Sequence, residues 1–84
     1  MKKKYFVYIL ECSDSTLYIG ITNDLDRRIT DHNTSKKGAK YTRGRRPVTL
    51  KYKEGLPSKS LALKREACLK KLSRKEKLFL TGKA

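Results

Sequence analysis

The chain has 84 residues and a formal net charge of +14, and 36% of its residues are charged. This length allows one small domain with a modest core, and no apolar run approaches the ~20 residues that a membrane-spanning helix needs. Two cysteines, Cys12 and Cys68, are too few for a disulfide framework or a zinc site of the usual ligand count, so we expect both to be small buried hydrophobic residues.

The first elements are predicted to be two strands joined as a hairpin. Tyr5–Glu11 is rich in β-branched and aromatic residues. It resembles the start of a signal peptide, but it is short and has no small-residue cleavage site, so we expect a strand of a cytoplasmic protein. Turn residues 13–15 lead into Thr16–Thr22, where apolar and polar side chains alternate. Pairing of these strands should bring Tyr8 and Tyr18 close together.

The next element is predicted to be a helix that runs to about His32. Asn23 or Asp24 can cap its N-terminus. Helical spacing at i, i+3, i+4 and i+7 gives it a core-facing stripe that consists of Leu25, Arg28, Ile29 and His32. Two of these four residues are polar, and such a conflict between pattern and chemistry is typical of a functional site.

A polar loop, 34–47, separates this helix from a third predicted strand, Val48–Lys53. That segment alternates apolar and polar residues, so we expect Val48, Leu50 and Tyr52 to share one face while the other face is exposed to solvent.

Two helices are predicted to follow the third strand. Ser58 or Ser60 can cap the first, which runs to about Leu72, and Ser73 can cap the second, Arg74–Leu80. The apolar arc of the first helix contains Leu61, Ala62, Cys68, Leu69 and Leu72, with Glu66 at its edge. The resulting order, ββαβαα, predicts an α+β domain of two layers.

The positive charge is concentrated in the second part of the chain. Residues 1–33 hold five bases and five acids, whereas residues 34–84 hold 17 bases and three acids. This excess favours a nucleic acid as partner, because each phosphate that is neutralised releases condensed counterions. A membrane surface is disfavoured, since the basic stretch contains no amphipathic helix. The alternative is a charged surface that only keeps the protein soluble.

The loop 34–47 is long for a compact domain, and such loops usually bind a ligand or are disordered. Its basic side chains are predicted to contact phosphates, which positions a nucleic acid without specifying its sequence. Its tyrosine can stack on a base or pack against the domain. The predicted nucleic-acid-binding residues are Lys36, Lys37, Lys40, Tyr41, Arg43, Arg45 and Arg46.

Five side chains are candidates for chemistry, although each has a simpler explanation. Tyr8 and Tyr18 are also ordinary strand aromatics. Arg28 can be a surface residue with a buried stem, and His32 can stabilise the C-terminal end of its helix. Glu66 can pair with the lysine four residues later. No single one of these residues is specific, so the case for a site depends on their joint spacing.

That spacing matches a known pattern. Phe6-Val7-Tyr8 is followed ten residues later by Tyr18-Ile19-Gly20, then by Arg28 and His32, and on a later helix by Glu66. The pattern resembles the GIY-YIG nuclease family, in particular its small stand-alone bacterial members, which are related to the catalytic domain of the excision-repair incision nuclease. The resemblance covers about residues 5–77, which we expect to be the core of a single domain spanning 1–84. Whether the tail 81–84 is ordered stays open.

The resemblance implies a small three-stranded antiparallel sheet flanked by helices, with a phosphodiester-cleaving site. One divalent metal, Mg²⁺ or Mn²⁺, would be held by Glu66. Tyr18 would activate water or accept its proton, and Tyr8 would orient the nucleophile and the phosphate. Arg28 would stabilise the pentavalent phosphate, and His32 would act as a base or as a phosphate ligand.

The sequence therefore predicts a metal-dependent endonuclease that hydrolyses phosphodiester bonds of DNA, with branched, damaged or single-stranded DNA as candidate substrates and repair or recombination as the setting. The alternative is a nucleic-acid-binding module with little or no catalysis, associated with RNA or the ribosome. Glu66 favours the enzyme, because a carboxylate repels phosphate unless a cation lies between them. DNA is favoured over RNA as the partner and no membrane is expected, while the substrate preference, the oligomeric state and any protein partner stay open.

Overall fold

The computed structural model describes residues 4–34 and 44–82. Two strands, a helix, a third strand and two further helices follow one another in the predicted ββαβαα order. The elements are β1 (Tyr5–Glu11), β2 (Leu17–Thr22), α1 (Leu25–Thr34), β3 (Thr49–Leu56), α3 (Lys59–Lys70) and α4 (Arg74–Leu80). The fold class is therefore α+β, as the sequence predicts.

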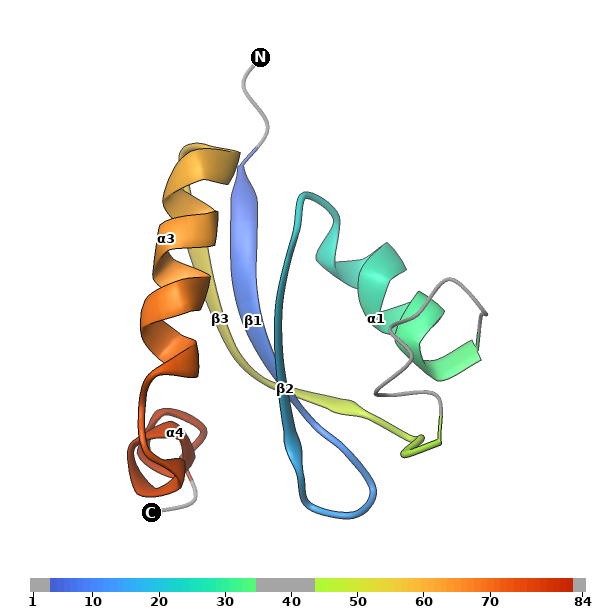
Figure 1. Cartoon of the computed structure of the whole chain (residues 1–84). Helices are drawn as coiled ribbons and strands as arrows, with labels where there is room; N and C mark the ends of the chain where they lie inside the picture. The colour runs from blue at the N-terminus through green and yellow to red at the C-terminus, as the bar shows by residue number, and fades with distance from the viewer. Residues whose placement is uncertain (1–3, 35–43, 83–84) are drawn as a thin grey trace.

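The three strands form one antiparallel sheet in the order β2-β1-β3. In Figure 1, α3 runs along one side of this sheet and α1 lies on the other side. The central strand β1 is covered on both faces, which explains its almost continuous apolar sequence. Its four consecutive residues from Val7 to Leu10 are each at most 1% exposed.

β1 and β2 form the predicted hairpin. The carboxylate of Asp14 holds the turn by accepting hydrogen bonds from the backbone N–H of Thr16 at 3.1 Å and from its hydroxyl at 2.5 Å. Tyr8 lies opposite Gly20, and Tyr18 lies two residues before Gly20 in β2, opposite Leu10. The two tyrosines are therefore diagonal neighbours on one face, with ring centroids 6.4 Å apart.

β3 departs from its predicted alternation at one residue. Ile9 and Leu10 are adjacent in β1, but they pair with Tyr52 and Leu50, so Lys51 is an extra residue at a β-bulge. A bulge reverses the alternation of side chains between the two faces. Leu50 accordingly packs on the α1 side and Tyr52 on the α3 side. The expectation of one shared apolar face for this strand is wrong, because alternation in one strand carries no information about its register with the next.

Each face of the sheet has its own hydrophobic cluster. The cluster beneath α3 is mainly aliphatic, with the buried residues Val7, Ile9, Ile19, Ala62 and Leu69. The cluster on the α1 side has the buried residues Tyr8, Leu10, Cys12 and Val48, and Tyr18, Leu25, Ile29 and Leu50 pack against it. The tyrosines singled out by the sequence therefore belong to the layer between the sheet and α1.

The buried face of α3 is narrower than the predicted apolar arc. Ala62 and Leu69 are buried, whereas Leu61 is 43% exposed and Cys68 is exposed. The prediction of two buried cysteines is thus correct for Cys12 and wrong for Cys68. A broad apolar arc does not show which of its sides contacts the sheet, and here the contact is made by the side that contains the alanine.

Local capping rules account for the helix ends. Asp24 caps α1 and Ser58 caps α3, each by accepting a hydrogen bond from a backbone N–H of the first turn at 3.2 Å. Ser73 and Glu76 form a reciprocal capping box at the start of α4. Gly82 follows α4 with φ +79°, a left-handed conformation that costs glycine little.

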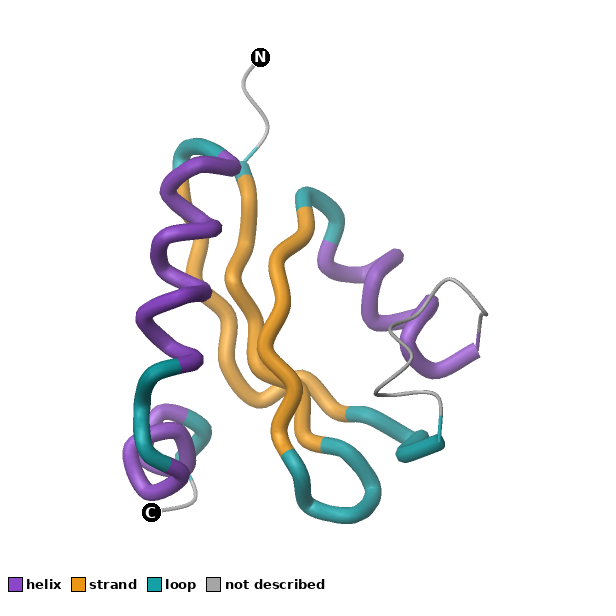
Figure 2. Tube along the Cα trace, viewed as in Figure 1, coloured by secondary structure: helices purple, strands orange, loops and turns teal. Residues whose placement is uncertain are grey.

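The β1–β2 turn and the segment that leads into β3 lie at the same end of the sheet (Figure 2). The backbone N–H of Ser13 donates to the carbonyl of Arg45 at 2.9 Å, and the guanidinium of Arg45 pairs with Asp14 at 3.0 Å. Arg74 of α4 donates to the carbonyl of Ser15 at 3.2 Å. The hairpin turn therefore connects three parts of the chain that are distant in sequence.

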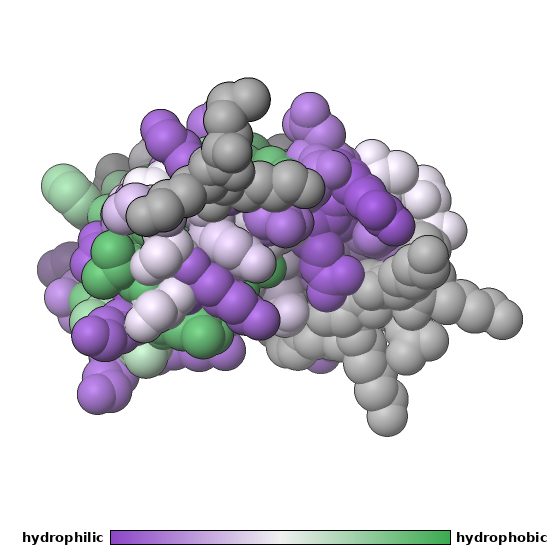
Figure 3. Space-filling model, turned by 90° about the horizontal axis from the view of Figure 1, so that it is seen from above, coloured by the Kyte–Doolittle hydropathy of each residue, from purple (hydrophilic) through white to green (hydrophobic). Residues whose placement is uncertain are grey.

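The described surface is mostly hydrophilic. Figure 3 shows hydrophobic residues mainly in the half that holds α3 and α4. The large exposed hydrophobic residues are Leu61, Leu63 and Phe79. Within the described ranges, no helix combines the length and apolar character needed to cross a bilayer.

Candidate active site

Tyr8, Tyr18 and His32 form an aromatic cluster between the sheet and α1. The hydroxyl of Tyr8 lies 3.0 Å from Nε2 of His32. The ring centroids of Tyr18 and His32 are 5.1 Å apart, and those of Tyr8 and His32 are 6.0 Å apart. Tyr8 and His32 are buried, whereas Tyr18 is partly exposed. Three of the five predicted catalytic residues, from three different elements, are thus in mutual contact.

The packing of these rings explains why position 20 is a glycine. A Cβ placed on Gly20 would lie 2.6 Å from the hydroxyl oxygen of Tyr8 and 3.1 Å from Cε2 of Tyr18. The first distance is far inside van der Waals contact, so any side chain there would displace the Tyr8 ring. The glycine of Tyr18-Ile19-Gly20 therefore makes room for the hydroxyl that contacts His32.

Burial sets the protonation states of the Tyr8–His32 pair. Burial raises the pKa of Tyr8 to about 12, although a hydrogen bond with Arg28 opposes the rise. Burial, helped by the charge of Arg28, lowers the pKa of His32 to about 4. At neutral pH the tyrosine is therefore protonated and the imidazole is neutral. The hydroxyl then donates to Nε2, and the ring proton of the histidine is on Nδ1.

Arg28 lies one turn before His32 on the same face of α1 and is half-buried. It hydrogen-bonds Tyr8, and its charge acts on both members of the Tyr8–His32 pair. The apolar members of the same stripe, Leu25 and Ile29, pack against the tyrosine cluster. The stripe therefore faces the core as predicted, and it places a permanent cation with several donors beside the hydroxyl of Tyr8.

Two residues that we did not assign to the cluster from the sequence hold the C-terminal end of α1. Nε of Arg46 donates to the carbonyl of His32 at 2.5 Å. Asn33 makes two hydrogen bonds with the backbone of Val48, accepting from its N–H at 2.7 Å and donating to its carbonyl at 3.1 Å. The turn that carries the histidine is thus attached to the start of β3. The sequence gives no signal for the Asn33 contact, because its partner is 15 residues away.

Glu66 approaches the cluster from the other layer of the domain. Its helix, α3, packs on the face of the sheet opposite α1. Its side chain is 19% exposed, and its carboxylate pairs with Nζ of Lys70 at 3.6 Å. The charge of Glu66 contributes to the raised pKa of Tyr8, so the carboxylate lies within electrostatic range of the cluster.

The donor set fits a cation that takes few protein ligands. Among the described residues, no group of three His, Cys, Asp or Glu side chains is arranged to hold a metal ion. Mg²⁺ binds through one or two carboxylates and completes its coordination with waters and phosphate oxygens of the substrate. The single carboxylate of Glu66 fits such an ion, whereas a structural zinc site would need four protein ligands.

The predicted basic loop is described only in part. Five of its candidate residues, Lys36, Lys37, Lys40, Tyr41 and Arg43, lie outside the described residues. The remaining two have partners within the domain, because Arg45 pairs with Asp14 and Arg46 donates to carbonyls at the end of α1. Contact of this loop with nucleic acid stays a prediction.

Known proteins are similar to this chain in sequence and in fold. A sequence profile of the GIY-YIG catalytic domain matches residues 4–78. A UPF0213 protein of Syntrophus aciditrophicus is 57% identical over 77 residues, which cover 92% of this chain and 88% of that protein. A UPF0213 protein of Halobacterium salinarum is 54% identical over 77 residues, covering 89% of this chain and 99% of that protein.

Two solved structures are also similar. The solution NMR structure of the UPF0213 protein BH0048 from Bacillus halodurans is 49% identical, with a TM-score of 0.59, and the match covers 94% of this chain and 83% of that one. The solution NMR structure of the protein EF2693 from E. faecalis is 44% identical, with a TM-score of 0.61, and the match covers 90% and 80% of the two chains.

The family match over most of the chain, together with these relatives, shows that this chain belongs to the GIY-YIG family. GIY-YIG domains are typically endonucleases that bind nucleic acid and use a divalent metal. The names of the UPF0213 relatives state a family and no activity.

Proposed function

We propose that this protein is a metal-dependent endonuclease that hydrolyses phosphodiester bonds of DNA. The observation that carries the proposal is the convergence of Tyr8, Tyr18, Arg28 and His32 in one cluster, with the Glu66 carboxylate within electrostatic range. A surface that only binds nucleic acid has no use for such a carboxylate, because it repels phosphate unless a cation lies between them. The net charge of +14 supports a polyanionic substrate.

Hydrolysis forms a bond from a water oxygen to phosphorus and breaks the bond to the leaving oxygen, so the attacking water must lose a proton. Tyr8 is poorly suited to accept it, because its pKa is about 12 and its hydroxyl is engaged with His32. We therefore assign proton acceptance to Tyr18, and orientation of the water and the phosphate to the Tyr8–His32 pair. Arg28 supplies a fixed cation for the charge that develops on the non-bridging oxygens.

Glu66 is the residue that would hold Mg²⁺ or Mn²⁺. When bound there, the cation supplies charge neutralisation at the phosphate and polarisation of water. The carboxylate comes from α3 and the tyrosines come from the sheet, so substrate would have to contact both layers at the β2 edge.

The decisive experiment incubates branched, gapped, single-stranded and plain duplex DNA, and matching RNA, with Mg²⁺ or Mn²⁺. We expect cleavage by the wild type and loss of cleavage in Glu66→Gln, with binding retained. Asp26→Asn is the matched control, since it removes the same charge from an exposed position on α1. Cleavage by wild type and Glu66→Gln alike would reveal a contaminating nuclease and would overturn the proposal.

The assignment of Tyr18 has a pH consequence. Proton acceptance requires the deprotonated phenolate, so activity that depends on it should rise with pH above neutrality. A flat rate between about pH 6 and pH 9, with the chemical step shown to be rate-limiting, would contradict the role of Tyr18.

A second candidate function is a nucleic-acid-binding module with little catalysis, acting on RNA or the ribosome. The observation in its favour is that two functional positions of some family members are not matched here. Ile21 stands where some repair members have a lysine, and no asparagine follows Asn33, although some members use a later asparagine. Tight binding by the wild type without cleavage of any substrate, with either metal, would establish this function in place of the first. Roles in repair or recombination and a cytoplasmic location stay predictions from the sequence.

A further inference from the structure

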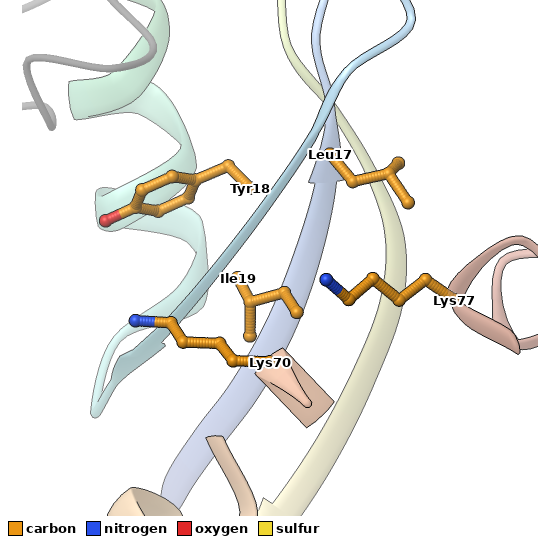
Figure 4. Close-up of a pocket in the computed structure, with 5 residues that line it drawn as sticks. All are labelled: Leu17, Tyr18, Ile19, Lys70 and Lys77. Carbon is orange, nitrogen blue, oxygen red and sulfur yellow. The ribbon is translucent and has the colours of Figure 1, made fainter. Parts of the chain in front are cut away.

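A hollow of about 270 Å³ lies beside Tyr18 where α3 and α4 approach β2. Its lining consists of Leu17, Tyr18, Ile19, Lys70 and Lys77. Figure 4 shows the tyrosine pointing to one side of β2, Leu17 and Ile19 pointing to the other, and both lysines extending from their helices toward the strand. Because β2 is an edge strand, this side of the sheet is accessible to an extended ligand.

The lining combines an aliphatic floor with two ammonium groups. Leucine and isoleucine offer apolar surface for van der Waals contact with the carbon atoms of a nucleotide sugar. The ammonium of lysine is a compact charge with three donors, which suits a phosphate group. The hollow is therefore matched to the sugar-phosphate backbone of a nucleic acid, and it borders Tyr18, to which we assign proton acceptance.

Lys70 is placed to serve both the carboxylate and a bound strand. Its side chain is 58% exposed, and its ammonium lies 3.6 Å from the carboxylate of Glu66, which precedes it by one helical turn. The ammonium is exposed, and 3.6 Å is a long distance for an ion pair, so it can exchange the carboxylate for a phosphate at little cost. The alternative role for Lys70 is to stay paired with Glu66, which would only shield a phosphate at the hollow from the carboxylate charge.

Lys77 is held more firmly than Lys70. It is half-buried on α4, whose start is set by the capping box of Ser73 and Glu76. Arg74, in the first turn of α4, donates to the carbonyl of Ser15 in the hairpin turn. These contacts fix α4 across the end of β2, which brings Lys77 beside Leu17 and Ile19.

We propose that this hollow is a second phosphate-binding site, in which Lys70 and Lys77 hold the backbone of a single nucleic-acid strand next to the phosphate that is cleaved. The inference rests on the proposed nuclease function for the position of the cleaved phosphate, but the site itself is defined by binding. The site gives the strand a path along the edge of the sheet.

The test compares two double variants that lose the same charge from the same two helices. Lys70→Gln with Lys77→Gln empties the hollow of cations, whereas Lys64→Gln with Lys75→Gln removes exposed lysines from other faces of α3 and α4. Affinity for a fluorescent single-stranded DNA is measured in EDTA over a range of salt concentrations. Loss of two phosphate contacts should make the slope of log K against log salt shallower by about 1.4 in the first variant and leave it nearly unchanged in the second.

Two further variants distinguish phosphate binding by the two lysines from shielding of the Glu66 charge by Lys70. Lys70→Arg with Lys77→Arg should keep the wild-type slope, because the charges remain. Lys70→Gln should still weaken binding in a Glu66→Gln background, where no carboxylate is left to shield. Equal slopes for the two glutamine double variants, or no effect of Lys70→Gln in that background, would overturn the proposal. If only the Lys70→Gln, Lys77→Gln variant lost affinity, and the wild type cleaved no DNA, the phosphate-binding site would be retained and the proposed nuclease function would be refuted.

Discussion

His32 should make the folded protein sensitive to mild acid. The imidazole is fully buried, and burial lowers its pKa from 6.5 to about 4. The folded protein therefore binds this proton less readily than the unfolded chain, so stability falls as pH falls from about 6.5 toward 4. This lowering of the pKa corresponds to about 3 kcal/mol when the transition is complete, and to about 2 kcal/mol between pH 7 and pH 4.5.

The measurement is urea unfolding of wild type and His32→Gln at several pH values between about 4.5 and 8. Glutamine does not titrate, and its amide can still bond the hydroxyl of Tyr8. Acidic residues contribute to the pH dependence of both proteins, so the difference between the two unfolding free energies isolates the histidine. On going from pH 7 to pH 4.5, the wild type should lose about 2 kcal/mol of unfolding free energy relative to His32→Gln.

A direct titration gives an independent check. His32 is the only histidine in the chain, so in a tag-free protein its imidazole signals can be followed by NMR without assignment. A folded-state titration midpoint near 6.5, together with a pH-independent difference between the two unfolding free energies, would refute the reasoning. It would mean that water reaches the ring, and that the Tyr8–His32 contact does not exclude the charged imidazole.

The remaining predictions concern packing and capping. Gly20→Ala should destabilise the protein by about 1–3 kcal/mol because its Cβ would meet the Tyr8 ring, whereas Gly55→Ala, whose Cβ has its nearest neighbour at 3.4 Å, should change the unfolding free energy by less than about 0.5 kcal/mol. Ser58→Ala should cost about 1 kcal/mol and Ser60→Ala almost nothing, since only the first caps α3; equal thermal shifts would contradict this assignment. Asn33→Ala should cost about 1–3 kcal/mol in urea unfolding by leaving the backbone of Val48 without its partner, and an unchanged midpoint would show that water replaces the amide.

Local sequence rules predicted the elements where the deciding interactions are local. The capping box of Ser73 and Glu76 uses residues three apart, and α4 begins where the sequence places it. The mixed stripe on α1 also faces the core as its spacing predicts. In both cases the stabilising contacts involve neighbours on one helix, or a face that helical geometry alone defines.

The same rules failed where the outcome depends on a distant strand. Alternation in Val48–Lys53 is regular, but pairing with β1 places a bulge at Lys51 and sends Leu50 and Tyr52 to opposite faces. Cys68 belongs to an apolar arc, yet the sheet contacts another side of that arc. Register and helix rotation are set by the packing of whole surfaces, which one segment does not encode.

For the candidate site too, some features follow from the sequence and others only from the tertiary structure. The sequence by itself predicted the fold class, limited the helix caps to one or two candidates each and proposed the residues of the candidate site, because spacing and residue type are local properties of the chain. Only the tertiary structure decided that Tyr8 donates to a neutral His32, that Gly20 makes room for this contact, and that Glu66 pairs with Lys70 beside a hollow at the β2 edge. Those features depend on desolvation and on contacts between different layers of the domain, which arise only when distant segments pack together.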